Sequence, residues 1–195
     1  MADVATALDS TDQVLNVDGS GLSLSVDSAS HSLLDTFCRK LPLSLQMEAD
    51  GHWLGVNWAC SVGVPVEVDV QIPKVLFTLV DQWLPSVVRQ VSAQTAQSWK
   101  AHEPRVVQVR ALRKGSWMRR SVSAPGLMDW FLCLSATQWP AEDGGWLYVE
   151  GEQGVSMAQN QLYVIPGERS FEFSLLTRHH ERLLIAGRLE TADSC

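Results

Sequence analysis

Residues that could do chemistry are spread thinly along this chain. The sequence contains no Gly-rich phosphate loop, no GxSxG nucleophile motif, no HExxH motif and no Cys/His spacing typical of a zinc site. Of the five histidines, only His179 and His180 are adjacent, and neighbours on a strand point to opposite faces. This pair is therefore poorly spaced to chelate a metal and predicts a polar turn before the last strand. The run Asp143-Gly144-Gly145 predicts a turn that leads into another strand.

The densest cluster of charge is basic. Six of the 15 Lys and Arg residues lie within residues 105–120, namely Arg105, Arg110, Arg113, Lys114, Arg119 and Arg120. Two interpretations stay open, a solvated strand face or an anion-binding rim in an otherwise acidic protein. The whole chain has 22 acidic residues and a formal net charge of −7, which argues against general binding to nucleic acid or to an anionic membrane.

Composition indicates one globular domain. The 195 residues are 46% hydrophobic and 19% charged, and no apolar run approaches the roughly 20 residues of a membrane helix. The first residues lack the basic start and apolar core of a signal peptide. The four cysteines (Cys38, Cys60, Cys133 and Cys195) form no CxxC pair and are expected to be reduced thiols. We therefore expect a cytoplasmic protein that binds neither nucleic acid nor membrane.

Hydrophobic spacing divides the chain into a helical part followed by a β-rich part. Residues 1–30 are rich in Asp, Ser, Thr and Gly and predict a flexible arm with one short edge strand around 22–26. The next segments predict a helix over 31–41, extended structure over 53–70, and a long helix over 74–99 that Pro85 kinks or divides in two. Alternation then predicts strands at 106–112, 130–134, 145–150, 162–165, 171–176 and 182–189. This order favours an α+β domain over 31–195, with a helical support layer (about 31–104) and a sandwich or barrel (about 105–190).

Four segments in the β-rich part resemble one family. They are residues 112–123 (LRKGSWMRRSVS), 131–147 (FLCLS, then WPAEDGGWL), 161–169 (QLYVIPGER) and 181–187 (ERLLIAG). In this order they are similar to the strand that enters the barrel, the strand and Gly-Gly loop, the strand before the distal ligand, and the last strand of prolyl 4-hydroxylase-like, iron(II)- and 2-oxoglutarate-dependent oxygenases. The resemblance implies a double-stranded β-helix, a jelly-roll barrel supported by the preceding helices. It also implies that Arg182 stands where the family binds the far carboxylate of 2-oxoglutarate.

The departures from the family lie at its metal site. Members hold iron with a His-x-Asp pair and a distal His. Here Ser121 and Ser123 stand at the positions of the pair and Phe171 at that of the distal His, so the resemblance implies three degenerate metal positions. Leu184 replaces the hydroxyl residue that follows the arginine. The family would use iron(II) and 2-oxoglutarate, but we expect this chain to use no cofactor. A rebuilt metal site would have to draw on Asp129, Asp143, His179, His180 and Glu181.

Three functional hypotheses follow. The first is a metal-free binding or regulatory protein that takes a small anionic molecule or a protein partner, for which an active paralogue is a candidate. The second is an enzyme with non-redox chemistry, a cyclase, isomerase or lyase, in the same barrel. The third is an active dioxygenase with a non-standard metal site. Arg182, Arg119, Trp117 and Tyr148 are the predicted ligand-binding residues, and the bland alternative for Arg182 is a pair with a carboxylate such as Glu172.

Overall fold

The computed structural model describes residues 15–16, 22–25, 28–41, 43–48, 51–61, 64–65, 74–102, 105–120, 124–135, 140–151, 153–159, 161–179 and 181–192. Its helices are α1 (Ser28–Cys38), α2 (Lys74–Thr95) and the short 3-10 helix η2 (Ala141–Asp143). Its strands are β1 (Leu15–Asn16), β2 (Leu22–Ser25), β3 (Ser44–Glu48), β4 (Gly51–Ser61), β5 (Val64–Pro65), β6 (Trp99–Ala101), β7 (Arg105–Leu112), β8 (Trp117–Arg120), β9 (Leu127–Cys133), β10 (Leu147–Val149), β11 (Gln161–Pro166), β12 (Phe171–Phe173) and β13 (Arg182–Thr191).

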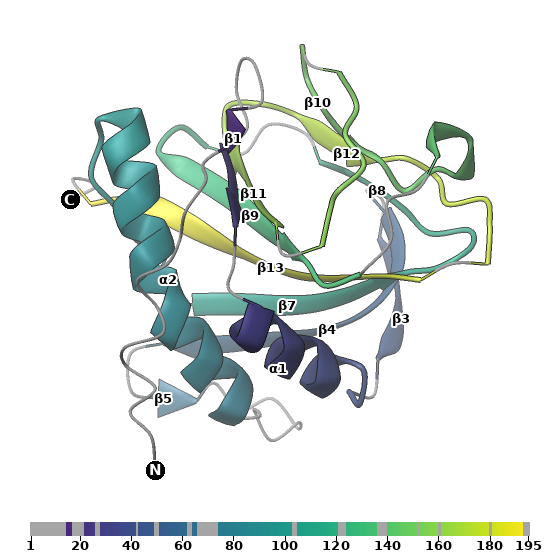
Figure 1. The fold of residues 1–195 in the computed structure, drawn as a ribbon, viewed down its shortest axis with the longest axis horizontal. Coiled ribbons are helices and arrows are strands. Elements are labelled where there is room, and N and C mark those ends of the chain that lie inside the picture. Colours follow the sequence, from purple (N-terminus) through teal and green to yellow (C-terminus); the bar gives the residue numbers. More distant parts are fainter. Residues whose placement is uncertain are drawn as a thin grey trace.

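The described strands form one curved antiparallel sheet whose main path is β1-β2-β11-β9-β13-β7-β4-β8-β12-β10. Off this path, β3 and β5 pair with β4, and β6 pairs with β13. The long strand β4 pairs with β7 over Leu54 to Cys60 and with β8 at Gly51 and His52. It therefore joins the two layers of a nearly closed barrel into a continuous sheet (Figure 1). The predicted α+β class and double-stranded β-helix are confirmed.

Helices α1 and α2 cover the outer face of β7, β9 and β13 (Figure 1). The described buried residues of α2 recur every three or four positions, at Val80, Leu84, Val87 and Val91, and so form one apolar stripe. Helix α2 continues through Pro85, so a division into two helices is wrong. No helix in the described part of the chain has the length and apolarity needed to cross a membrane.

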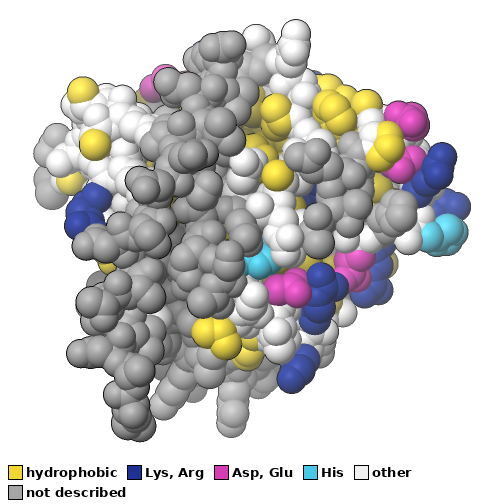
Figure 2. Space-filling view, in the orientation of Figure 1, with side chains coloured by type: hydrophobic (Ala, Val, Ile, Leu, Met, Phe, Trp, Pro, Cys, Tyr) yellow, Lys and Arg dark blue, Asp and Glu magenta, His cyan; other side chains and the backbone are white. Residues whose placement is uncertain are grey.

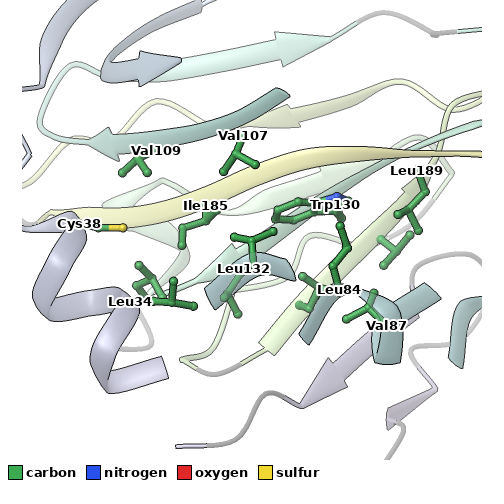
Figure 3. Packing of buried hydrophobic residues seen from close by; sticks show 14 of the residues in the cluster. Leu34, Cys38, Leu84, Val87, Val107, Val109, Trp130, Leu132, Ile185 and Leu189 are labelled. Atoms are coloured by element: carbon green, nitrogen blue, oxygen red, sulfur yellow. The ribbon is translucent and has the colours of Figure 1, made fainter. Parts of the chain in front are cut away.

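The contact between the helices and the sheet is the outer core of the protein. Trp130 of β9 lies at its centre, among Leu84 and Val87 of α2 and Leu132 of its own strand (Figure 3). Trp130 is 1% exposed. Gly187 of β13 lies directly opposite Trp130, and a Cβ at that position would collide with the indole ring. The outer core is therefore packed to leave no room beneath its largest side chain.

The opposite face of the same strands forms a second cluster, the interior core, inside the barrel. Successive residues of a strand point to opposite faces. On β13, Leu183 and Ile185 accordingly join the outer core, while Leu184 and Ala186 join the interior core. The other members of the interior core are Trp53, Leu112, Met118, Phe131, Cys133, Leu147, Val149, Met157, Tyr163, Ile165, Phe171 and Phe173.

The first half of the chain was predicted to be a helical support layer, but it also contains several strands of the sheet. Strands β3 to β6 all lie within the region predicted as that layer, and β4 occupies the middle of the sheet. The segment predicted as extended over 53–70 therefore belongs to the barrel itself. In the region predicted as an arm, the expected strand is present as β2, which lies between β1 and β11 and not at the edge, and α1 begins at Ser28.

Candidate functional site

Phe171, the residue that the sequence resemblance assigns to the distal metal ligand, is a buried aromatic side chain. Phe171 begins β12, which lies between β8 and β10, and it is 4% exposed in the interior core. Its ring makes an edge contact with Phe131, with 5.2 Å between centroids, and Phe131 makes a second edge contact of 5.2 Å with Phe173. A phenyl ring offers no lone pair to a metal, and these contacts fix it in an apolar cluster. Phe171 therefore does not fit an iron site.

Ser121 and Ser123, the other two residues predicted to be degenerate metal positions, lie outside the described residues. As residue types they offer neutral hydroxyl groups, which are poor ligands for iron(II) beside the imidazole and carboxylate of a facial triad. Over the residues whose placement is described, no three His, Cys, Asp or Glu side chains are grouped so that they could hold a metal ion.

The residues considered for a rebuilt metal site are engaged elsewhere. Asp129 contacts Arg188 with 2.9 Å from Nε to Oδ1, and Asp143 contacts Arg178 with 2.6 Å from Nε to Oδ1. Glu181 lies between Arg113 (2.6 Å) and Arg39 (3.8 Å). His179 Nε2 is 3.5 Å from Lys114 Nζ, and His180 lies outside the described residues. Each of these described groups faces a different cation.

Arg182 lies in the barrel, at the start of β13 and opposite Leu112 of β7. It is completely buried, and its Nη1 donates a hydrogen bond of 2.9 Å to the carbonyl oxygen of Gly145. Burial lowers the pKa of Arg182 from its ordinary value. Glu172, the carboxylate considered as a partner, is an exposed residue of β12. In this fold Arg182 thus ties the last strand to the loop before β10.

That loop depends on the two glycines of the predicted turn. Gly144 and Gly145 have φ angles of 76° and 68°, a region that favours glycine. A Cβ at Gly144 would also collide with the backbone carbonyl of Leu175. The turn predicted from Asp143-Gly144-Gly145 is present, with η2 leading into it, and it brings the Gly145 carbonyl to Arg182.

Two weakly acidic side chains lie near Arg182 in the interior core. Burial raises the pKa of the Cys133 thiol, and the charge of Arg182 offsets part of this rise. Burial likewise raises the pKa of Tyr163. Both groups are therefore neutral near pH 7, so neither supplies a general base there.

The chain folds back over this part of the barrel through residues 153–158. Val155 and Leu147 exchange two backbone hydrogen bonds of 3.0 and 2.8 Å, and Met157 is fully buried in the interior core. The amide of Ala158 donates to the Tyr163 hydroxyl at 3.0 Å, and Cys133 Sγ lies 3.7 Å from the Met157 carbonyl oxygen. A segment of the chain itself therefore packs against the residues around Arg182.

The other predicted ligand-binding residues do not join Arg182. Met118 of β8 points into the barrel, so its neighbours Trp117 and Arg119 lie on the outer face, where both are exposed. Tyr148 lies on the outer face of β10 between two interior residues, and it is opposite Glu172. Arg182 and Phe171 are the predicted site residues that the structure places in the barrel interior.

The basic run of residues 105–120 is divided among different surroundings. Arg113, Lys114 and Arg119 are exposed, and Arg113 pairs with Glu181. Figure 2 shows Lys and Arg side chains interleaved with acidic ones along the right-hand edge of this face. Arg110, by contrast, is buried in the barrel. Its two-residue spacing from Leu112 on a predicted strand places both on one face, so Arg110 does not share the solvated surface of the other basic residues named here.

No protein-family model matches this sequence, and comparison with curated proteins finds no similar sequence. Solved structures do match. A prolyl-4-hydroxylase from Pseudomonas putida aligns with 89% of this chain and 93% of its own, at 18% identity and a TM-score of 0.61. A 2OG-Fe(II) oxygenase family oxidoreductase from Burkholderia pseudomallei aligns with 88% of this chain and 85% of its own, at 13% identity and a TM-score of 0.67.

A third neighbour is HygX from Streptomyces hygroscopicus, solved with nickel, 2-oxoglutarate and hygromycin B bound. It aligns with 89% of this chain and 84% of its own, at 12% identity and a TM-score of 0.55. At these identities the likeness shows the fold. The chain has the barrel fold of prolyl 4-hydroxylase-like 2-oxoglutarate and iron(II) oxygenases, so the resemblance predicted from four sequence segments is confirmed at that level.

Proposed function

We propose that this chain is a metal-free, non-oxygenase protein of the oxygenase fold, which acts by binding. The observation that supports the proposal is the burial of Phe171 in edge contact with Phe131, because the sequence resemblance assigns Phe171 to the distal ligand. An oxygenase of this kind needs three protein groups on iron(II), with open positions left for oxygen and 2-oxoglutarate. Ser121, Ser123 and Phe171 supply neither imidazole nor carboxylate.

The bound species in this proposal is a small anionic molecule or a protein partner, and an active paralogue would fit the second case. Retaining Arg182 inside the barrel supports the first case, because guanidinium groups bind oxyanions through charge-assisted hydrogen bonds. The alternative of non-redox catalysis needs a general base, and the raised pKa values of Cys133 and Tyr163 argue against either as that base. The scattered cysteines agree with a cytoplasmic location.

Metal and cosubstrate titrations test the proposal directly. Iron(II) is added under anaerobic conditions to the purified chain with 2-oxoglutarate, and the weak visible charge-transfer band of the ternary complex is monitored. A parallel assay measures succinate formed from 2-oxoglutarate. We expect no band, no stoichiometric iron, manganese or cobalt, and no succinate. One metal per chain with a clear band would overturn the proposal.

A gain-of-function variant tests the assignment of the three positions. Ser121→His, Ser123→Asp and Phe171→His together recreate the family's ligand types at those positions, and we expect the triple variant to bind iron(II) or cobalt(II). The matched control carries Phe171→His alone, which supplies one ligand and should bind neither metal tightly. A folded triple variant without metal binding would contradict the assigned positions.

A further inference from the structure

The barrel has a second outer face, away from the two α-helices. Helices α1 and α2 pack on β7, β9 and β13. Figure 1 shows these helices on one side of the barrel, with β8, β10 and β12 on the other. Alternate residues of these three strands point outward, because the residues between them belong to the interior core, namely Met118, Leu147, Val149, Phe171 and Phe173. The outward residues of β8, β10 and β12 therefore face away from both the interior core and the helices.

Strand pairing joins outward residues of β3, β4 and β8 into one row. Met47 is directly opposite His52, and His52 is directly opposite Trp117. Directly opposite residues share a face of the sheet, so these side chains are neighbours. Met47 is 73% exposed, Trp117 is 36% exposed, and Leu45, two residues before Met47 on the same face, is 55% exposed. Large apolar side chains that are exposed together on one face are typical of an interaction surface.

A second row continues the first on β8, β12 and β10. Arg119 lies two residues along β8 from Trp117 and is directly opposite Glu172, which is directly opposite Tyr148. Arg119 and Glu172 are both exposed. Aromatic, Met and Arg side chains are the types enriched at the centres of protein interfaces. We call the two rows together the outer stripe, and its composition is that of a protein-binding surface.

The charges of the outer stripe make it complementary to itself. A two-fold axis that runs between β8 and β12, parallel to the strands, turns Arg119 of one copy onto Glu172 of the other, and the reverse. Two sheets with nearly aligned strands pack face to face in this way. Each chain carries a net charge of −7, so random contacts between copies are repulsive. A contact that pairs opposite charges is favoured over them.

We propose that the outer stripe is the interface of a two-fold symmetric homodimer of this chain, in which Arg119 of each copy pairs with Glu172 of the other. Trp117 and Met47 lie beside these charges and supply the apolar part of the contact. The inference goes beyond the proposed binding function, because it concerns the outward face and a second copy rather than the barrel interior. It also gives a role to Trp117, Arg119 and Tyr148, the predicted ligand-binding residues that point away from that interior.

Sedimentation equilibrium of the purified full chain tests the interface. We expect the wild type to dimerise reversibly as its concentration is raised. Arg119→Glu and Glu172→Arg each place like charges opposite one another across the axis, and each should weaken the dimer tenfold or more. Met47→Ser should weaken it several-fold, because it removes an apolar contact. The matched control Lys114→Glu makes the same change in net charge as Arg119→Glu at an exposed residue outside the outer stripe, and it should leave the dimer unchanged.

Mixing the two charge variants tests whether the partner is a second copy. In an equimolar mixture of Arg119→Glu and Glu172→Arg, both pairs across the axis again join opposite charges. We therefore expect heterodimers of nearly wild-type affinity from two chains that associate poorly with themselves. Pairing within one chain does not explain such a rescue, because each variant carries two like charges at these positions.

Three results would each overturn the proposal: a wild type that is monomeric at every concentration, a dimer that neither charge variant weakens, or a mixture that stays monomeric. A mixture that stays monomeric would mean that a different protein covers the outer stripe. Circular dichroism checks that each variant folds, and if a charge variant does not, an undiminished dimer in Met47→Ser overturns the proposal instead. None of these results alters the metal and succinate tests of the proposed function.

Discussion

The outer core and the interior core lie on opposite faces of the same strands. They differ in the types of apolar side chain they contain and in the buried charged residues beside them. The outer core joins the helices to the sheet through aliphatic residues packed around Trp130. The interior core is richer in aromatic and sulfur-containing side chains, and Arg110 and Arg182 are buried beside it. Buried charge is costly and is rarely retained for packing alone. The comparison predicts that substitutions in the outer core act mainly on stability, while the interior core is where the proposed binding function would reside.

The largest expected effect is in the outer core. Trp130→Ala should lower the free energy of unfolding by about 3–5 kcal/mol, because it removes the largest side chain of a core whose surroundings can close only partly. Urea unfolding measures the loss. The control Trp117→Ala removes a tryptophan that is 36% exposed and should cost clearly less. Similar losses in the two variants would contradict the assignment of stability to the outer core.

A smaller and more local effect is expected in the interior core. Met157→Ala should lower the free energy of unfolding by about 2–3 kcal/mol, because it removes a fully buried side chain that is smaller than the Trp130 indole and so leaves a smaller cavity. Hydrogen exchange should become faster at the Leu147 and Val155 amides, which bond to each other's carbonyls. Exchange at the outer-core strands should change little. Uniformly faster exchange would mean that the two cores act as one unit.

The sequence predicts the two faces of a strand wherever polar and apolar residues alternate along it. Alternation along β13 predicts that Arg182 and Leu184 share a face, and the structure has Leu184 in the interior core and Arg182 buried beside it. The same rule applied to β8 puts Met118 on one face and Trp117 and Arg119 on the other. The prediction that Trp117 and Arg119 bind a ligand in the barrel rests only on the resemblance of their segment to the family. Resemblance located the strand, but alternation decides which side chains enter the barrel.

The sequence alone does not predict which distant strands pair with each other. The role of β4 as the strand that links β7 to β8 depends on partners far away in the chain. The stack of Arg110 on Trp53 depends on the same pairing, since it joins residues 57 positions apart (110 − 53). The continuity of α2 through Pro85 is a related case, because packing against the sheet overrides a local helix-breaking preference.

An intermediate loss of stability is expected when the ion pair between Asp129 and Arg188, on the interior face of β9 and β13, is broken. Asp129 and Arg188 are directly opposite each other on β9 and β13, and their side chains are 8% and 34% exposed. Asp129→Asn should lower the free energy of unfolding by about 1–3 kcal/mol, because a largely buried cation loses its carboxylate, although partial exposure of Arg188 reduces the cost.

The matched control for this pair is Glu181→Gln. This variant removes the 2.6 Å pair with Arg113 and the longer 3.8 Å contact with Arg39. The side chains of Glu181, Arg113 and Arg39 are 30%, 57% and 49% exposed. An exposed pair is worth about 0–1 kcal/mol. Urea unfolding of both variants should therefore separate them, and a greater loss in Glu181→Gln would show that burial does not govern these ion pairs.

The smallest expected effect lies where α1 meets both cores. His31 of α1 is 2% exposed and lies near the backbone of Cys133 and Leu134, one residue from each core. Burial is the main cause that lowers the pKa of His31 below 6.5, while the nearby charges of Asp35 and Arg39 raise and lower it respectively. The fold therefore favours the neutral ring, and the unfolded chain binds the proton more tightly.

This difference gives the pH dependence a definite sign. The contribution of His31 to stability is complete above its unfolded-state pKa near 6.5, and it is lost as pH falls through the lower pKa of the folded state. Urea midpoints of the wild type should therefore fall between about pH 7 and pH 5 more steeply than those of His31→Gln. The control His52→Gln alters a partly exposed histidine of β4 and tests whether the change in slope is specific to His31. Parallel slopes for the wild type and His31→Gln would mean that protonation does not act at this junction, because other groups would then account for all of the acid sensitivity.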